Sequence, residues 1–192
     1  MSEKNTEGKI NKEDAIVILD RTIGFVNNCD SKASIILGVF GVIFTLIFTT
    51  DGIVNIRRIV DKVTAVGNVS VCSMLYLFGW LASLIVIVLG LCKIISVLTA
   101  RIDCSHMEQE QLDTDSKIYF GDIAKNETYR KYKGKLLSLN SERFLNDIGS
   151  QIYINSVICS NKFKKYNESL LLTTIGFTCF LLLWIVGYAI LL

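Results

Sequence analysis

The sequence predicts an all-α integral membrane protein, in which three transmembrane helices are extended by cytoplasmic amphipathic helices. The main observation is the uneven distribution of charged residues along the chain. The 192-residue chain contains three runs without Asp, Glu, Lys or Arg, which are 18, 30 and 24 residues long and occupy 33–50, 63–92 and 169–192. About 20 apolar residues in a helix cross the hydrocarbon core of a bilayer. The chain also contains no proline, which suits long unbroken helices.

Composition excludes several other classes of protein. Hydrophobic residues make up 51% of the chain and the mean hydropathy is +0.46, which is unusual for a soluble enzyme. The six cysteines show no regular framework, and three lie in or against apolar runs, so a secreted disulfide scaffold is not indicated. A net charge of +2 gives no reason to expect a nucleic-acid partner. The first apolar run begins too late, and is too long, for a cleaved signal peptide.

The first predicted helix follows a polar tail at 1–11. Asn11 precedes Glu13 and Asp14, which is typical of a helix start with acids in its first turn. Apolar residues then recur at helical spacing, at Ile16, Leu19, Ile23 and Val26. We therefore expect an amphipathic helix that continues into a first span at about 33–50, and we treat 12–192 as one membrane domain.

A short basic connection at 51–68 separates the first two spans. Its apolar residues Ile53, Ile56 and Val60 fall on one face of a helix, so we expect it to lie along the membrane surface. The second span is predicted at about 71–98. Lys93 lies near its end, where a long side chain can reach the interface.

Residues 101–168 form the only sizeable soluble segment. A second amphipathic helix is predicted to begin near Asn140 or Ser141. Its apolar stripe comprises Phe144, Ile148, Ile152, Ile158 and Tyr166. We expect this helix to enter the third span, at about 169–190, without a break.

The distribution of Lys and Arg predicts the orientation. Segment 1–32 carries five of them, 51–68 carries three and 101–168 carries eleven. With three spans, 1–32 and 101–168 share one side of the membrane, and we place that side in the cytoplasm. The C-terminus is then expected in the periplasm or outside the cell.

Residues for catalysis or metal binding are scarce. His106 is the sole histidine, and with Cys104 it offers two possible ligands, whereas a structural zinc site needs four. No Ser/His/Asp or Cys/His set and no phosphate-binding glycine motif is present. Asn126 begins a glycosylation sequon that would go unused in the cytoplasm. We expect no catalytic residue, no metal site and no enzymatic activity.

The first informative cluster, Asp30-Ser-Lys32-Ala33, lies where the first helix enters its span. Asp30 and Lys32 are about 200° apart around a helix, so one can point into the bundle while the other meets lipid headgroups. A charged border at the membrane interface is the simpler interpretation.

The second cluster is the turn Phe120-Gly121-Asp122. A glycine between an aromatic residue and an acid is typical of a tight turn or a close backbone approach. The simpler interpretation makes Asp122 the N-cap of a short helix that continues toward Tyr132.

The third cluster, Gln151, Asn155 and Lys162, shares one face of the helix that leads into the third span. A solvated face or an interhelical polar network would explain it, but a lysine with amide side chains also suits a cyclic phosphate and a nucleobase. The candidate ligand site combines the three clusters and comprises Asp30, Lys32, Phe120, Gly121, Asp122, Gln151, Asn155 and Lys162.

At these clusters the chain resembles the transmembrane effector family of Pycsar antiphage systems. The resemblance runs from about Leu19 to the end and rests on Asp30-Ser-Lys-Ala33, Ile118-Tyr-Phe-Gly-Asp-Ile-Ala124 and Gln151-Ile-Tyr-Ile-Asn155, continuing to Lys162. It implies a bacterial inner-membrane protein paired with a uridylate or cytidylate cyclase, which makes cyclic UMP or cyclic CMP on infection. The effector would then impair the membrane and stop growth before phage release.

These features favour a homo-oligomeric effector that responds to a cyclic nucleotide and needs no other cofactor. Three spans from one chain do not easily enclose a pore, so several copies are expected. No separate cyclic-nucleotide-binding domain is evident, so either the cytoplasmic helices or a partner bind the nucleotide. The alternative is a membrane anchor or scaffold whose cytoplasmic stalk docks a protein. An integral-membrane enzyme would need acids or histidines within a span, and the three runs contain none.

Overall fold

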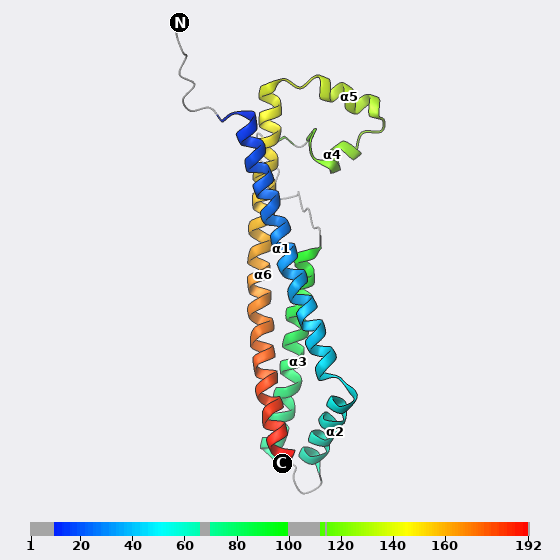
Figure 1. Cartoon of the computed structure of the whole chain (residues 1–192), viewed down its shortest axis with the longest axis vertical. Coiled ribbons are helices and arrows are strands. Elements are labelled where there is room, and N and C mark those ends of the chain that lie inside the picture. Colours follow the sequence, from blue (N-terminus) through cyan, green and yellow to red (C-terminus); the bar gives the residue numbers. More distant parts are fainter. Residues whose placement is uncertain (1–9, 66–69, 100–111, 114, 192) are drawn as a thin grey trace. The chain divides into compact units, whose positions relative to one another are not determined.

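The computed structural model describes residues 10–65, 70–99, 112–113 and 115–191. Within these residues the chain is helical and contains no strand (Figure 1). The helices are α1 (Lys12–Ile47), α2 (Thr50–Thr64), α3 (Val71–Leu98), α4 (Phe120–Ala124), α5 (Tyr129–Leu137) and α6 (Ser141–Leu191). The predicted all-α class is confirmed.

Three of these helices are long and apolar enough to cross a membrane, namely α1, α3 and α6. They carry large apolar side chains on their outer faces, including Leu46, Ile85 and Ile185, which are 68%, 52% and 64% exposed. Such faces would be a liability in water but suit contact with lipid tails. The prediction of three membrane helices is confirmed.

Both long amphipathic helices begin at the asparagines indicated by the sequence. The backbone N–H of Asp14 donates to Asn11 Oδ1 at 2.7 Å, and that of Arg143 donates to Asn140 Oδ1 at 2.8 Å. These side chains satisfy backbone donors that have no partner within the helix. As predicted, α1 and α6 each continue into their apolar segments without interruption, although Ile16 and Ile23 of the expected α1 stripe are 36% and 39% exposed.

The first apolar helix ends slightly earlier than expected, at Ile47, because the chain turns into α2 within two residues. Thr49 Oγ1 accepts the Gly52 N–H at 3.3 Å and caps α2. A Cβ at position 52 would lie 2.0 Å from the Ile47 carbonyl oxygen, so the turn requires glycine.

The chain comprises two compact units, to which both α1 and α6 contribute. The polar unit comprises 1–28 and 101–161, and the apolar unit comprises 29–100 and 162–192. Within the described part of the polar unit lie α4, α5 and the first turns of α1 and α6, with the Lys12 ammonium 4.5 Å from the Phe144 ring centroid.

Helices α3 and α6 approach each other closely in the apolar unit. A Cβ at Gly90 would lie 2.2 Å from Thr173 Oγ1, and one at Gly176 would lie 3.0 Å from the Ile87 backbone nitrogen. Small residues at such positions let helix backbones approach in lipid. The core beside this contact contains Cys29, Ala33, Ile94, Val97 and Tyr166.

Helix α2 packs on α3, and the residues that it buries are Ile59 and Val63. Its Asn55 side chain donates to the Tyr188 hydroxyl of α6 at 2.8 Å. Of the predicted apolar face, Ile53 is 53% exposed whereas Ile56 and Val60 are half-buried, and its position along the membrane surface stays a prediction. An apolar pocket beside this contact is lined by Ile56, Ile59, Val60, Tyr76, Leu77, Trp80 and Trp184.

Candidate functional site

An ion pair joins α1 to α6 in the apolar unit. Lys162 Nζ lies 2.6 and 2.7 Å from the two carboxylate oxygens of Asp30. The side chains are 15% and 34% exposed, respectively. Two residues from separate sequence clusters therefore meet, and each satisfies the charge of the other.

Lys32 contacts α6 as well, next to the partner of Asp30. Its ammonium lies 5.7 Å from the ring centroid of Phe163, and the residue is exposed. This distance is within the range of a cation–π interaction. Asp30 and Lys32 thus contact adjacent residues of α6, whereas contact of Lys32 with lipid headgroups stays a prediction.

The Phe120-Gly121-Asp122 cluster forms most of α4 in the polar unit. Phe120 is 73% exposed. A Cβ at Gly121 would lie 2.5 Å from the Tyr119 ring, so the glycine permits the close approach that its position suggested.

The prediction that Asp122 is an N-cap is wrong. Asp122 lies inside α4, whose N-cap is Tyr119, and the next helix is capped by Thr128. The Asp122 carboxylate instead accepts the Ser116 N–H at 3.3 Å and pairs with Lys125 Nζ at 2.6 Å. Its carboxylate therefore holds the preceding turn against α4.

The polar row of α6 is divided between the two units. Gln151 is buried at 5% exposure and Asn155 is half-buried, and the Asn155 amide donates to the Gln151 backbone carbonyl at 2.8 Å. Both belong to the polar unit, whereas Lys162 belongs to the apolar unit with Asp30 and Lys32. A shared ligand site for all eight candidates stays a prediction.

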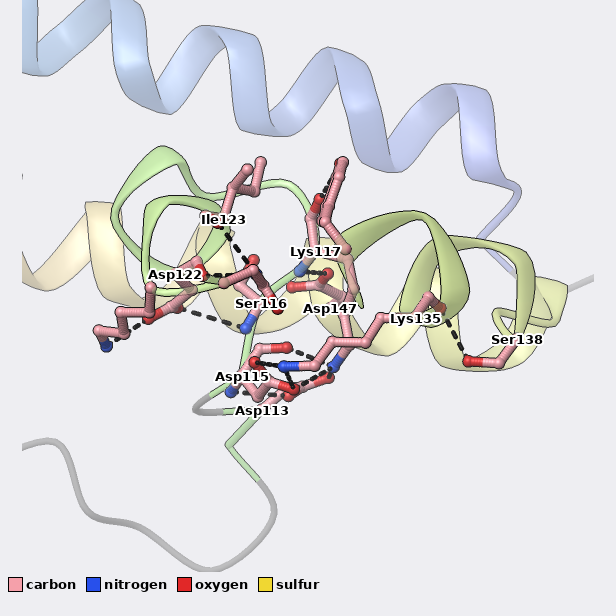
Figure 2. A network of polar contacts seen from close by, with 12 residues as sticks. Asp113, Asp115, Ser116, Lys117, Asp122, Ile123, Lys135, Ser138 and Asp147 are labelled. Carbon is pink, nitrogen blue, oxygen red and sulfur yellow. Dashed lines mark hydrogen bonds and ion pairs between the residues drawn. The ribbon is translucent and has the colours of Figure 1, made fainter. Parts of the chain in front are cut away.

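Asp147 is the functional candidate that the sequence analysis missed. It is fully buried, and its Oδ2 accepts the Lys117 N–H at 2.8 Å (Figure 2). Its Oδ1 is also buried, and no residue in the described part of the chain hydrogen-bonds to it. The available signal was spacing, because Asp147 precedes Gln151 by one helical turn and shares its face.

Lysines and carboxylates hold the turn that covers Asp147 (Figure 2). Lys117 Nζ lies 3.5 Å from Asp113 and 3.6 Å from Asp115, and Lys135 Nζ lies 3.0 Å from both Asp115 oxygens. The hydrogen bond from Lys135, aided by the charges of Lys135 and Lys117, holds the pKa of Asp115 below its usual range despite some desolvation.

The two possible metal ligands of the sequence, Cys104 and His106, lie outside the described residues. Across the described ranges, no three His, Cys, Asp or Glu side chains form a group that could hold a metal ion. The Asn126 amide of the sequon donates to the carbonyls of Asp122 and Ile123 at the end of α4.

Comparisons with known proteins agree with this architecture. A family model described as Pycsar effector protein domain matches residues 14–191. A curated relative from Gulbenkiania mobilis, named Pycsar effector protein GmPycTM, is 28% identical over 177 residues, covering 88% of this chain and 89% of the relative. No solved structure shows a significant match.

Proposed function

The chain belongs to the Pycsar effector family, and from this premise we propose that a cyclic pyrimidine nucleotide switches it on to impair membrane integrity. Family membership makes it an effector of antiphage defence rather than a cyclase. The activating nucleotide is cyclic UMP or cyclic CMP, made by a partner uridylate or cytidylate cyclase. Loss of membrane integrity then stops the infected cell before phage release.

The observation that carries this proposal is the continuity of α1 and α6. Each helix contains a candidate membrane span and also contributes to the polar unit, over 36 and 51 residues respectively. A ligand that prefers one arrangement of the polar unit biases the membrane segments of the same helices. It shifts the population by its difference in affinity for the two states.

The proposal places the protein in the bacterial inner membrane, with 1–32 and 101–168 in the cytoplasm. The excess of Lys and Arg in these two segments supports this orientation. Several copies act together, because three spans do not easily enclose a pore. The lipid bilayer is the target, and no further cofactor or nucleic acid takes part.

A second candidate is a membrane anchor whose polar unit docks a protein. Exposed apolar side chains of that unit favour it, because Phe120, Tyr129 and Leu137 are 73%, 75% and 75% exposed. Aromatic side chains of this kind are frequent at the centres of protein interfaces.

Membrane potential in cells separates the two candidates. Bacteria expressing the chain would be supplied with cyclic UMP or cyclic CMP by an inducible cyclase, with a catalytically inactive cyclase as the control. Our proposal predicts depolarisation only with the active cyclase. An intact potential in cells that contain both the effector and the nucleotide would favour the anchor.

A further inference from the structure

We propose that Asp147 and Gln151 of α6 receive the base edge of the activating nucleotide. Asp147 Oδ1 accepts an N–H of the pyrimidine base, and the Gln151 amide donates to a neighbouring acceptor on the same edge. This inference rests on the proposed activation by a cyclic pyrimidine nucleotide, and it names the residues that recognise that nucleotide.

The two side chains form part of a buried polar face. Asp147, Ser150 and Gln151 are 0%, 7% and 5% exposed, and their spacing places them on one side of α6. The polar unit thus buries a carboxylate, a hydroxyl and an amide side by side. Burial of this kind is costly unless each polar atom has a partner.

The hydrogen bonds of this face leave one strong acceptor unused. The backbone N–H of Lys117 donates to Asp147 Oδ2, and that of Asp113 donates to Ser150 Oγ at 3.1 Å. Asp147 Oδ1 receives no donor from the residues that the structure places. A buried carboxylate oxygen without a donor can accept a hydrogen bond from an N–H group of a ligand.

The chemistry of the surroundings selects a base rather than a phosphate or a metal. The lysines of this network pair with Asp113, Asp115 and Asp122, and Asp147 is itself a carboxylate, so an anionic group is disfavoured beside it (Figure 2). Among the described side chains, no group of three ligands suits a metal ion. A neutral base that presents an N–H fits both constraints.

Either pyrimidine meets this requirement. Cytosine offers its N4 amine to a carboxylate and its ring N3 to an amide donor. Uracil offers its ring N3–H to the carboxylate and a neighbouring carbonyl to the amide donor. Because an amide both donates and accepts, Gln151 serves either base.

The turn that covers Asp147 links recognition to conformation. Asp113 and Lys117 fasten this turn to α6 through their backbone N–H groups, at Ser150 and Asp147 respectively. The base reaches Asp147 only when the turn shifts. Nucleotide binding therefore stabilises an arrangement of the polar unit that differs from the one described.

Calorimetry on the full-length protein in lipid nanodiscs tests the inference, with cyclic CMP and cyclic UMP titrated separately. We expect Asp147→Asn to weaken nucleotide binding about 10-fold or more, because its amide offers a donor where an acceptor is needed. Gln151→Ala is expected to weaken binding by about 5-fold or more. Glu13→Gln, at an exposed acid in the first turn of α1 and outside the turn that covers Asp147, is the control and should leave affinity within about 2-fold.

Thermal unfolding distinguishes recognition from a structural role. Asp147→Asn removes a buried charge with one unpartnered oxygen, so we expect its melting temperature to stay unchanged or rise while affinity falls. If this variant does not fold, Gln151→Ala carries the test.

The nucleotide that binds the unaltered protein identifies the base. Binding that neither Asp147→Asn nor Gln151→Ala weakens would overturn this inference alone. If the unaltered protein binds neither nucleotide, direct activation fails as well, and the inference falls with it.

Discussion

The two units of the chain treat buried polar groups in different ways. In the apolar unit, the buried hydroxyls of Ser83, Ser169 and Thr173 each donate to a backbone carbonyl of their own helix. In the polar unit, the buried side chains of Asp147 and Ser150 accept from the backbones of Lys117 and Asp113, which lie 30 and 37 residues earlier in the chain. Asp147 is left with an unused acceptor within the described residues.

These two patterns of hydrogen bonding suit the separate roles that the proposed function gives the two units. Hydrogen bonds within one helix stay satisfied when helices slide or separate in lipid, whereas a contact between helices such as the Asp30–Lys162 ion pair would be lost. Bonds between segments tie the polar unit to one arrangement, which a ligand with better partners can replace. The proposed function accordingly assigns sensing to the polar unit and membrane damage to the apolar unit.

The largest expected effect comes from the close contact of α3 and α6. Gly90→Ala places a methyl group 2.9 Å from the Thr173 backbone nitrogen, so the helices must separate. We expect a loss of about 1–3 kcal/mol in unfolding free energy, typical of overpacking. Thermal unfolding in detergent measures it.

Gly38→Ala is the matched control for that prediction. It introduces a methyl group into a helix where nothing lies within 4 Å, so helix propensity should leave the melting temperature unchanged or slightly higher. Equal melting temperatures for the two variants would contradict the close contact.

A smaller effect is expected from the ion pair of the apolar unit. A double-mutant cycle with Asp30→Asn and Lys162→Met should give a coupling energy of about 1 kcal/mol, because the partly buried pair is still screened by solvent. Additive effects of the two substitutions on the unfolding free energy would show that the pair is not formed.

The smallest effect is expected from the exposed carboxylate of Asp115. Because Lys135 holds its pKa below the usual value, the stabilisation is complete at neutral pH. It declines as the pH falls below the usual carboxyl value and is lost once the pH is below the lowered pKa. Acid unfolding of the unaltered protein and Asp115→Asn should therefore differ slightly at neutral pH and converge in acid.

Local signals in the sequence predicted much of the fold. The helix starts at Asn11 and Asn140 depend on residues three positions apart, and the membrane helices depend on uninterrupted apolar runs. The end of α1 was predicted late because Thr49 and Gly52 set up a turn within an uncharged stretch.

The site was less predictable because its contacts are distant in sequence. Asp122 matched a local capping pattern, but its carboxylate accepts from Ser116, six residues earlier. The Asp147 carboxylate accepts a hydrogen bond from the backbone of Lys117, 30 residues earlier, and the residues around Asp147 on α6 do not predict that contact. Asp30 and Lys162 were both selected from the sequence, yet their pairing across 132 residues required the structure.

Dye release from liposomes that contain only the purified chain tests whether this chain alone senses the nucleotide and damages the membrane. Cyclic UMP or cyclic CMP would be added on the side that bears 101–168, with Asp147→Asn liposomes in parallel. We expect rapid release by the unaltered protein with one or both nucleotides, and much weaker release by the variant. Liposomes that stay sealed with both nucleotides would contradict the claim that one chain both senses the nucleotide and damages the membrane.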